Sequence, residues 1–395
     1  MKRNFTLKNT CSNTCARVGE LMTPHGIVTT PVFLPVGSQG SVKTVTPAEL
    51  HQIGTTMILG NTYHLYLRPG IEIIERMGGL HAFMGWNKPI LSDSGGYQVF
   101  SLAPLCKIAD DGVVFRSHID GSEHLFSPEN VIKFQERLGV DVMMPLDHCV
   151  STDEDKHVVS EAMERTHLWA EMCLRYYSNK ERLLFAIVQG GLYPDLRRKS
   201  AQVLIDMDFP GYAIGGLSLG ESKHITWEMV EIMTSCLPEL KPRYLMGVGS
   251  PEDILEGVSQ GIDIFDSALP TRVARNGALF SGTGRQNITK SEFNDRKAPF
   301  EENCDCYTCR NFSAAYIHHL FRSGELLAYR LATIHNLRFV VKLMENIRIA
   351  IRNDTFNSFK IDFLSRYETT NEASRILQKQ RWMQNQRNKS DIAFQ

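Results

Sequence analysis

IDIFDSALPTR, residues 262–272, joins an apolar run of strand length to a carboxylate, Asp266, near its carboxyl end. Seven earlier runs of similar length are nearly continuous in hydrophobicity rather than alternating, which is typical of parallel strands buried on both faces. The eight runs are PVFLPV (31–36), TMILGN (56–61), PILSDS (89–94), DVMMPLD (141–147), LFAIVQG (184–190), YAIGGL (212–217), RYLMGVG (243–249) and IDIFDS (262–267).

Helical patterns lie between several of these runs. Two carry start signals, because Ser127-Pro128-Glu129 and Ser250-Pro251-Glu252 each offer a Ser cap, a Pro at the first helical position and an acid in the first turn. Further helices are predicted near 153–177, 195–207 and 224–236, and the segment 97–125 is expected to be an insertion with short strands of its own.

The carboxyl ends of the runs carry residues suited to a binding site. They are Asp93, Asp147, Gln189, Gly216, Met246 and Asp266. Eight strand–helix units with such residues at one end favour an α/β fold, the (β/α)8 TIM barrel, whose active site lies at that face. A doubly wound sheet is the alternative, but it would bring these six positions to one pocket less naturally.

Composition places the chain among ordinary globular proteins. Its 395 residues are 43% hydrophobic and 22% charged. No N-terminal apolar run resembles a signal peptide, and no run approaches the roughly 18 residues of a membrane span. The nine cysteines are an odd number in a large chain without a secretory signal, so we expect a reducing cytoplasm rather than a disulfide framework.

Charge is unevenly distributed along the chain although the net charge is only -1. Residues 271–395 contain 20 Lys and Arg against 12 Asp and Glu, whereas residues 1–270 contain 23 against 32. A basic C-terminal third on an acidic body suits the binding of a polyanion at one place. A solvated charged surface is the plainer interpretation of the same count.

Cys304, Cys306 and Cys309 form a Cys-x-Cys-x2-Cys cluster in a polar segment. Three thiolates at this spacing can wrap one tetrahedral zinc ion, and a later helix can supply the fourth ligand. Free buried cysteines are the alternative. Three cysteines within six residues of a polar loop argue against it. The residues alone leave the fourth ligand open between His335, His318 and His319. A closed Cys3His site is structural, because it leaves no position for water.

These signals divide the chain into three parts. We expect residues 1–290 to form the barrel, 291–352 a zinc-binding subdomain with closing helices, and 353–395 a C-terminal helix and a polar tail. Within them, TRVARNGALFSGTGRQNITK (271–290) is expected to be a polar Gly-rich loop and residues 314–352 a helical region. The last thirty residues are interpreted as a helical or frayed tail without chemistry.

The segment LSDSGGYQVF places Asp93 at a strand end, followed by Ser94, Gly95, Gly96 and Tyr97. The glycines let the backbone approach a ligand closely, and an aromatic ring just after them can stack on a flat ring. A turn or helix cap is an equally good interpretation of Asp93 on spacing alone.

Asp266 can act with a second carboxylate across the barrel mouth. One carboxylate can attack a sugar carbon while its partner handles protons, which is the logic of retaining glycosidic bond cleavage. Asp263 is interpreted as a surface or cap residue. Asp147 and Gln189 offer an acceptor and an amide, which suits the edge of a purine-like base.

At these residues the sequence resembles the tRNA-guanine transglycosylase (queuine tRNA-ribosyltransferase) family, in its bacterial type. The resemblance extends from about Phe33 to His335 or Phe363. Its motifs are specific in combination and occur in this order: SDSGGYQ, IVQGG, AIGGLSLGE, YLMGVG, FDSALPTR and CxCxxC…H. Chance agreement on all six is not a serious alternative.

The resemblance implies a glycosyltransferase (pentosyltransferase) and its residues. Asp266 would be the nucleophile at C1′ of the wobble nucleotide, and Asp93 the general acid and base. Substrate contacts would fall on Asp93, Ser94, Gly95, Gly96, Tyr97, Asp147, Gln189, Gly216, Leu217 and Met246, with Tyr97 and Met246 sandwiching the base. RNA contacts would fall on Gly247, Val248, Gly249, Ser250, Pro251, Glu252, Asp253, Thr271, Arg272, Val273, Ala274 and Arg275. One structural Zn2+ per subunit would be held by Cys304, Cys306, Cys309 and His335.

The implied reaction exchanges guanine at position 34 of tRNAs with GUN anticodons (Asp, Asn, His, Tyr) for 7-aminomethyl-7-deazaguanine, the prequeuosine base, in queuosine biosynthesis. The partners are the tRNA anticodon loop, the free 7-deazaguanine base and a second copy in a cytoplasmic homodimer, with no membrane. Leu219 is bulky where relatives that accept queuine tend to have glycine, which favours the smaller base. Ser267 replaces a frequent cysteine with little expected effect.

There are three alternatives to this function. Queuine is the alternative incoming base. A non-catalytic RNA-binding member is disfavoured because both Asp93 and Asp266 are present. A retaining glycoside hydrolase would need two close carboxylates but neither a zinc appendage nor a basic loop after the barrel.

Overall fold

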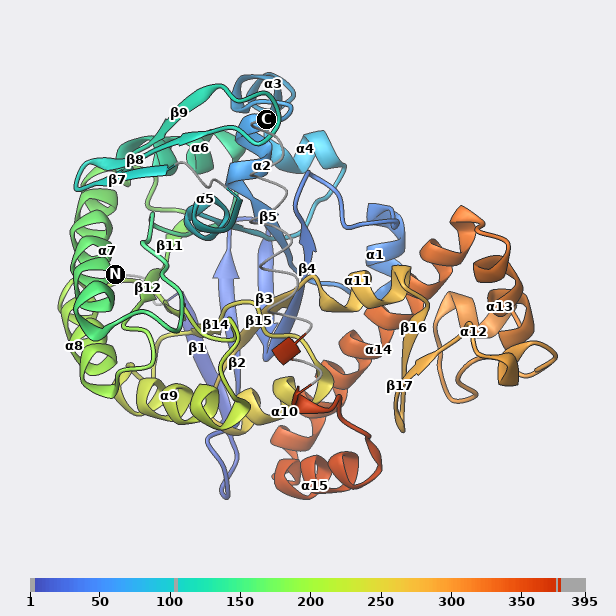
Figure 1. Cartoon of the computed structure of the whole chain (residues 1–395). Coiled ribbons are helices and arrows are strands. Elements are labelled where there is room, and N and C mark those ends of the chain that lie inside the picture. The colour runs from blue at the N-terminus through green and yellow to red at the C-terminus, as the bar shows by residue number, and fades with distance from the viewer. Residues whose placement is uncertain (1–3, 103–105, 374–375, 378–395) are drawn as a thin grey trace.

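The computed structural model describes residues 4–102, 106–373 and 376–377, and a ring of parallel strands surrounded by helices is its central feature (Figure 1). The ring consists of β4 (Val32–Gly37), β5 (Ile58–Asn61), β6 (Ile90–Asp93), β10 (Val142–Met143), β11 (Leu183–Leu184), β12 (Ala186–Val188), β13 (Tyr212–Ile214), β14 (Arg243–Leu245) and β15 (Ile264–Ser267). Every neighbouring pair in it is parallel.

The ring closes through one interrupted strand. β11 pairs with β10 and β12 pairs with β13, and only Phe185 separates β11 from β12. Counting these two pieces as one, the described residues form eight strand positions, so the predicted (β/α)8 barrel is confirmed. Helices α1 (Pro47–Ile53), α2 (Thr62–Leu67), α3 (Ile71–Arg76), α4 (Leu80–Met84), α6 (Pro128–Leu138), α7 (Lys156–Tyr176), α8 (Pro194–Asp206), α9 (Lys223–Cys236) and α10 (Pro251–Ser259) lie outside the strands.

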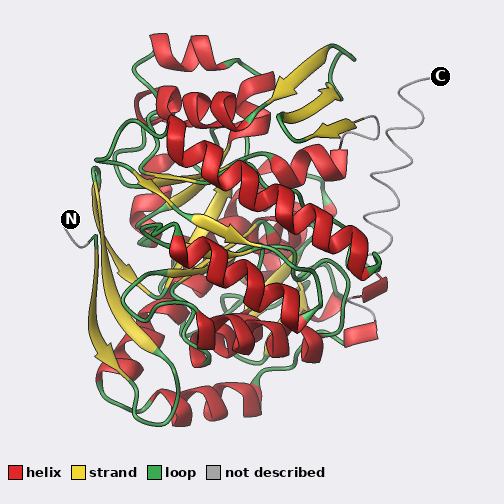
Figure 2. Ribbon diagram, turned by 90° about the vertical axis from the view of Figure 1, so that its left-hand side faces the viewer, coloured by secondary structure: helices red, strands yellow, loops and turns green. Residues whose placement is uncertain are grey.

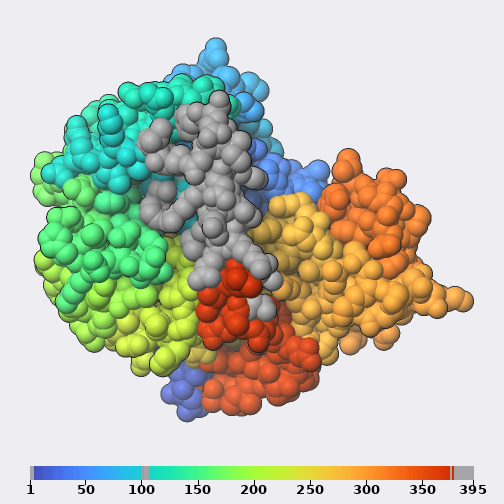
Figure 3. Space-filling model, in the orientation of Figure 1, coloured from blue at the N-terminus to red at the C-terminus, as the bar shows by residue number. Residues whose placement is uncertain are grey.

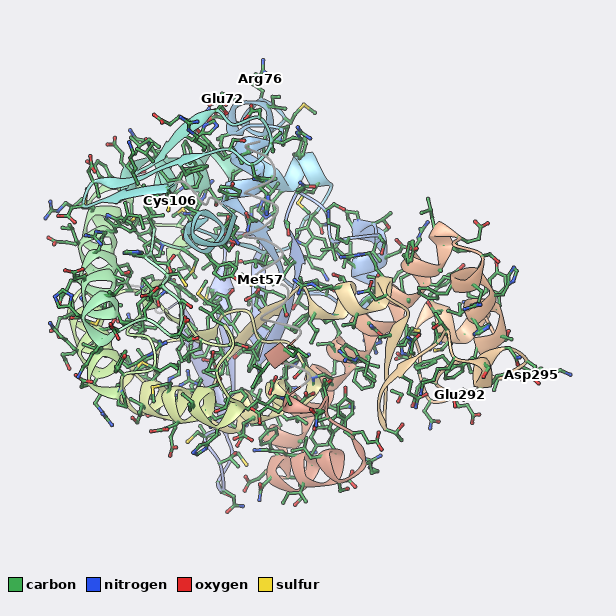
Figure 4. All side chains as sticks on the ribbon, viewed as in Figure 1. Met57, Glu72, Arg76, Cys106, Glu292 and Asp295 are labelled. Atoms are coloured by element: carbon green, nitrogen blue, oxygen red, sulfur yellow. The ribbon has the colours of Figure 1, made fainter. Side chains whose placement is uncertain are left out.

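Side chains alternate between the inside of the barrel and the helical layer. One buried cluster contains Leu34, Leu91 and Ile264 of three barrel strands, whereas Phe33 and Phe265 belong to the cluster under the helices. Because successive residues of a strand point to opposite faces, the residue two positions after an interior one also points inward. Met57, fully buried in the interior cluster, lies within the ring in Figure 4.

Both predicted helix caps are present. The Ser127 hydroxyl accepts from the Asn130 N–H at 3.1 Å, and the Ser250 hydroxyl accepts from the Asp253 N–H at 3.3 Å. The predicted insertion is also present: α5 (Gly96–Leu102) is followed by an antiparallel sheet of β7 (Cys106–Ala109), β8 (Gly112–Arg116) and β9 (Glu123–Phe126).

A second antiparallel sheet covers the amino-terminal end of the barrel. It consists of β1 (Phe5–Thr10), β2 (Arg17–Thr23) and β3 (Gly26–Thr30), and Figure 2 shows it on the opposite side of the molecule from β7–β9. Phe5, Leu21 and Val28 of this sheet join the interior cluster. The amino-terminal end is therefore sealed, which leaves the carboxyl ends of the strands as the open face.

The interpretation of Asp263 as a surface or cap residue is wrong. Its side chain is fully buried and accepts hydrogen bonds from the Arg17 guanidinium at 3.0 and 2.5 Å and from the Arg243 N–H at 2.8 Å. Arg17 also donates to the carbonyls of Glu239 and Lys241. This ion pair fastens the terminal sheet to the start of β15.

The carboxyl half of the predicted run 141–147 is not a regular strand. The side-chain amide of Gln135 on α6 donates to the Met144 carbonyl at 2.8 Å and accepts from the Met144 N–H at 3.0 Å. A side chain therefore replaces the ladder partners of this residue, and the chain is free to turn toward Asp147.

The segment 271–290 is not the loop we expected. It contains the end of α11 (Leu269–Arg275) and a hairpin of β16 (Ala278–Ser281) and β17 (Gly284–Asn287). Buried Ala274, Leu279 and Phe280 explain the difference, because they give this polar segment an apolar side that packs on the rest of the protein.

The chain then forms a projecting lobe with η1 (Ser291–Phe293), α12 (Tyr307–Asn311) and α13 (Ala314–Arg322) before α14 (Leu326–Arg352) returns to the barrel (Figures 1 and 3). Figure 4 places Glu292 and Asp295 at the outer edge of this lobe. Because α14 packs on β4, α1 and α10, it occupies the place of the eighth barrel helix.

The predicted helical region 314–352 is divided at Gly324, whose φ of 72° is left-handed. α15 (Phe356–Arg366) follows. Most of the segment interpreted as a helical or frayed tail lies outside the described residues. None of the described helices is long and apolar enough to cross a membrane.

We expect Arg17→Met to lower the free energy of unfolding by about 3–5 kcal/mol, because it leaves the carboxylate of Asp263 buried without its cation. Urea unfolding followed by circular dichroism measures this. The control is Lys8→Met on the same sheet, whose ion pair with Glu20 is exposed and should contribute less than about 1 kcal/mol. Equal losses in the two variants would contradict the role of the buried pair.

Candidate active site

Three buried carboxylates meet at the open face of the barrel. Asp266 stands two residues after interior Ile264, and Asp93 two residues after interior Leu91, so both point into the mouth. Asp147 follows β10. The three residues are 7%, 9% and 8% exposed, which removes them from bulk water but leaves them reachable.

Asp266 is held by two neutral donors on one oxygen. The Tyr244 hydroxyl donates to Oδ1 at 2.6 Å, and the Gly247 N–H donates to the same oxygen at 2.8 Å. Among the residues that the structure describes, no hydrogen bond reaches Oδ2. Burial raises the pKa of Asp266, while the two donors favour its charged form. Oδ2 is therefore the oxygen available for attack.

Asp93 is surrounded by neutral donors as well. Asn61 donates to Oδ2 at 2.6 Å, Gln98 donates to the same oxygen at 3.1 Å, and the Thr62 N–H donates to Oδ1 at 3.1 Å. Burial raises the pKa of Asp93 to about 8, and the negative charges of Asp266 and Asp147 raise it further against these hydrogen bonds. At neutral pH, Asp93 therefore holds a proton.

Asp147 and Gln189 form one fixed unit. The Gln189 amide donates to Oδ2 of Asp147 at 2.8 Å, and the Ser94 hydroxyl donates to Oδ1 at 3.1 Å. Gly96 packs directly on this carboxylate, since a Cβ there would lie 2.5 Å from Oδ1. Burial raises the pKa of Asp147, which Gln189 and Ser94 oppose.

The remaining predicted base contacts flank this unit. Gly216 has a φ of 66°, and a Cβ there would lie 2.4 Å from Oε1 of Gln189. Leu217 is buried, and Met246 packs against the interior cluster. Burial raises the pKa of Tyr97 to about 12, with the Cys149 thiol adding to the shift and the positive charge of Arg272 opposing it.

The first predicted RNA segment, 247–253, comprises the loop after β14 and the first residues of α10. A Cβ on Gly249 would lie 2.4 Å from that of Ser267, so this loop packs on the neighbour of Asp266. Glu252 and Asp253 accept from the ammonium of Lys223 at 3.1 and 2.8 Å. The ammonium therefore compensates part of their negative charge, which lowers their repulsion of a phosphate.

The second predicted RNA segment, 271–275, lies on α11 just after β15. Thr271, Val273 and Ala274 are buried, whereas Arg272 is exposed. Burial and the charge of Arg272 lower the pKa of Arg275, and its Nη1 has no hydrogen-bond partner among the described residues. Two guanidinium groups close enough to repel one another make a favourable place for an anion.

Cys304, Cys306, Cys309 and His335 form a second constellation, beside the barrel. The Nδ1 atom of His335 lies 3.6, 3.6 and 3.3 Å from the three sulfur atoms. Ligands of one tetrahedral zinc ion are about 3.5 Å apart when Zn–S is about 2.3 Å and Zn–N about 2.0–2.1 Å. The donor set therefore fits zinc.

The histidine that the residues alone had left open is His335. Its Nε2 lies 2.7 Å from the Phe280 carbonyl, which fixes the ring and leaves Nδ1 for a metal. His318 instead bonds the Ile288 carbonyl through Nδ1, and His319 lies 3.5 Å from the Ser323 hydroxyl.

Several site residues were missed in the sequence. Asn61 and Tyr244 belong to apolar runs of the sequence. A polar group within a run that is otherwise apolar is the signal that could have identified them. Buried Glu221 accepts from the Leu219 and Gly220 N–H groups at 2.9 and 3.1 Å and so shapes the turn after β13. Its position at the end of a Gly-rich segment, just before a helix, could have indicated this.

The fold and the site define a class: a barrel enzyme whose carboxylates can act on a glycosidic carbon, with a Cys3His group beside the barrel that fits a metal ion. Residues 11–369 match the family described as queuine tRNA-ribosyltransferase. A protein of that name from Dehalococcoides mccartyi is 60% identical over 97% of this chain and 98% of its own length. Those of Thermoanaerobacter pseudethanolicus and Herpetosiphon aurantiacus are 58% identical (90% and 95% of the two chains) and 53% identical (94% and 95%).

The chain belongs to the queuine tRNA-ribosyltransferase family and is an enzyme of the pentosyltransferase class. The predicted family, in its bacterial type, is confirmed. The chain also covers nearly the full length of these relatives.

We expect Asp266→Asn to lower the pKa of Asp93 from its value near 8, because one of the negative charges that raise it is removed. Infrared spectra recorded against pH report the protonated carboxyl band, and Asp93→Asn identifies it. Asp147→Asn is the comparison variant and should lower the pKa by less. A wild-type Asp93 that titrates in the ordinary acid range would contradict the raised pKa.

Proposed function

We propose that this enzyme exchanges guanine at wobble position 34 of tRNAs with GUN anticodons for 7-aminomethyl-7-deazaguanine, through a covalent link between Asp266 and the RNA. The observation that carries the proposal is the pairing of a carboxylate with one open oxygen, Asp266, and a carboxylic acid, Asp93, in one buried mouth. Nucleophilic displacement at a sugar carbon needs both.

The first half of the reaction breaks the bond to guanine. Oδ2 of Asp266 attacks C1′ as the C1′–N9 bond breaks, and the electron pair passes to the base, which takes the proton of Asp93. The carboxylate of Asp266 also stabilises positive charge that develops on the ribose. The departing base leaves as neutral guanine.

The second half reverses these steps with the new base. Asp93, now ionised, accepts the N9 proton of the incoming base, whose nitrogen attacks C1′ and releases Asp266. Two displacements at one carbon retain its configuration, and the covalent link conserves the bond energy, so no nucleotide cofactor is required.

Binding of the RNA is assigned to the two segments beside the mouth. Arg272 and Arg275 follow Asp266 on the same strand–helix unit, so a phosphate on them would lie next to the nucleotide under attack. The target base must leave its stack, which is least costly in a single-stranded loop. Tyr97 and Met246 can then take it between them, and stacking returns about 1–3 kcal/mol.

The incoming base is assigned from the turn after β13. Leu219 is half-buried in this turn, and its N–H is fixed by Glu221 at 2.9 Å. A bulky side chain held in this way limits the room for a substituent, which favours the aminomethyl base over the larger queuine. A homodimer and a cytoplasmic location stay predictions.

The Cys3His centre would hold one structural zinc ion. Zinc bound there would fold the lobe and fix His335 on α14, and it leaves no ligand position for chemistry. The carboxylates of the mouth carry the reaction without it.

Incubation with tRNA should trap a covalent protein–RNA adduct, seen as a slower band in denaturing electrophoresis. Asp266→Asn should lose this adduct and at least about a thousandfold in exchange of radiolabelled guanine, as expected when a nucleophile is removed. Asp93→Asn should still bind tRNA but exchange no base.

The adduct also tests the alternatives. 7-Aminomethyl-7-deazaguanine should discharge it and queuine should not. A wild-type protein that binds tRNA without forming the adduct would be a non-catalytic member, and cleavage of an unrelated glycoside would favour a hydrolase.

Metal analysis of the purified protein should find roughly one zinc ion per chain, and Cys306→Ser should lose it and melt at a lower temperature. Cys15→Ser is the control, because this exposed cysteine lies outside the cluster. Wild-type protein without zinc, or zinc retained in Cys306→Ser, would contradict the assignment of this group as a zinc site.

A further inference from the structure

Arg197 is a fully buried cation bonded to main-chain carbonyls. It lies in the first turn of α8, where Nε donates to the Gly191 carbonyl at 2.8 Å. Nη1 donates to the carbonyls of Gly215 at 2.9 Å and Val188 at 3.3 Å, and Nη2 lies 3.5 Å from that of Gly216. One side chain thus joins the ends of β12 and β13.

A buried arginine normally has a carboxylate partner, because desolvating its charge is costly. Within the described residues, Arg197 has no carboxylate at ion-pair distance. Burial lowers its pKa to about 10, and Glu221 and Cys149 favour the charged form, so it is a cation at neutral pH. Carbonyl dipoles therefore solvate the charge, and the arrangement fixes those carbonyls.

The bond to the Gly215 carbonyl sets the orientation of a peptide group. The Gly215–Gly216 peptide is trans, so its N–H points away from its carbonyl. Since the carbonyl points to Arg197, the Gly216 N–H points to the opposite side. A cation on the carbonyl also polarises the peptide and strengthens its N–H as a donor.

The Gly216 N–H is available to a ligand. No hydrogen bond within the described residues takes it, and Gly216 itself is partly exposed. The neighbouring amide of Gln189, already bonded to Asp147, lies so close that only glycine fits at this position.

We propose that Arg197 is a specificity-determining positioning residue, which aims the Gly216 N–H at the ring carbonyl oxygen of the incoming guanine-type base. This inference rests on the proposed function, because it assumes that the base binds beside Gln189 and Gly216. It predicts selection of 6-oxo bases over bases with a weaker acceptor at that position.

The test compares guanine with 6-thioguanine, which keeps the ring N–H but replaces the oxygen by sulfur, a weak acceptor. Wild type should prefer guanine in kcat/KM by about tenfold or more, as expected for one well-oriented hydrogen bond. In Arg197→Met the KM for guanine should rise by at least about tenfold and the preference should fall to less than about threefold.

Trapping of the tRNA adduct separates the possible failures. Arg197→Met should still form it, because Asp266 and the RNA segments are unchanged. An adduct with an unchanged preference for guanine would overturn the role of Arg197. Absence of the adduct in wild type would instead overturn the proposed function.

Two further variants control for folding. Arg198→Met replaces the exposed neighbour on the same helix and should keep the wild-type preference. If Arg197→Met does not fold, Arg197→Lys is the substitute, because it keeps the charge but cannot reach both strand ends. The preference of this variant for guanine over 6-thioguanine should be lower than that of wild type by a factor of about five. A folded Arg197→Lys with the full preference would also overturn the proposal.

Discussion

The chemistry at the mouth depends on one constraint: three carboxylates are buried together, and no described cation is hydrogen-bonded to any of them. Their donors are amides, hydroxyls and main-chain N–H groups. Neutral donors orient a carboxylate without lowering its pKa as far as an adjacent arginine would. Asp93 is therefore a carboxylic acid beside two carboxylates, Asp266 and Asp147, whose negative charges act on it.

The division of roles follows from the distribution of these donors. Both donors of Asp266 converge on one oxygen, which stabilises its charge and leaves the other oxygen open for the attack that we propose. Burial and the charges of Asp266 and Asp147 raise the pKa of Asp93. In the proposed reaction, this keeps the proton on the residue that would deliver it. In that reaction, forming the ester would remove the charge of Asp266 and make Asp93 a stronger acid in the step that uses it.

The lobe beside the barrel supports the mouth through α14. The imidazole of His335 lies against the three cysteine sulfur atoms and is fixed by the Phe280 carbonyl, and the next residue, Asn336, is fully buried. Its amide donates to the carbonyls of Pro270 at 3.1 Å and Ala278 at 3.0 Å, and it accepts from the Phe280 N–H at 2.9 Å. Helix α11, which carries Arg272 and Arg275, is thus anchored to Asn336, the residue next to His335.

The sequence predicted what local pattern determines. Apolar runs located the barrel strands, and the carboxyl ends of these runs placed Asp93 and Asp266 at the mouth. Asp263 lies near the start of the run 262–267, and its partner Arg17 is 246 residues away. No neighbouring residue in the sequence therefore indicated a buried ion pair. The donors that decide which carboxylate keeps a proton also come from other strands, and only the closed ring brings them together.

Arg197 is fully buried near the proposed base site, yet it is not bonded to any of the three carboxylates. An arginine bonded to Asp147 would lower the pKa of that carboxylate and weaken the field that keeps Asp93 protonated. Arg197 is directed instead to carbonyls behind the strand ends, where its charge polarises peptide groups of the pocket. The positive charge can then organise base recognition without removing the proton on which the reaction depends.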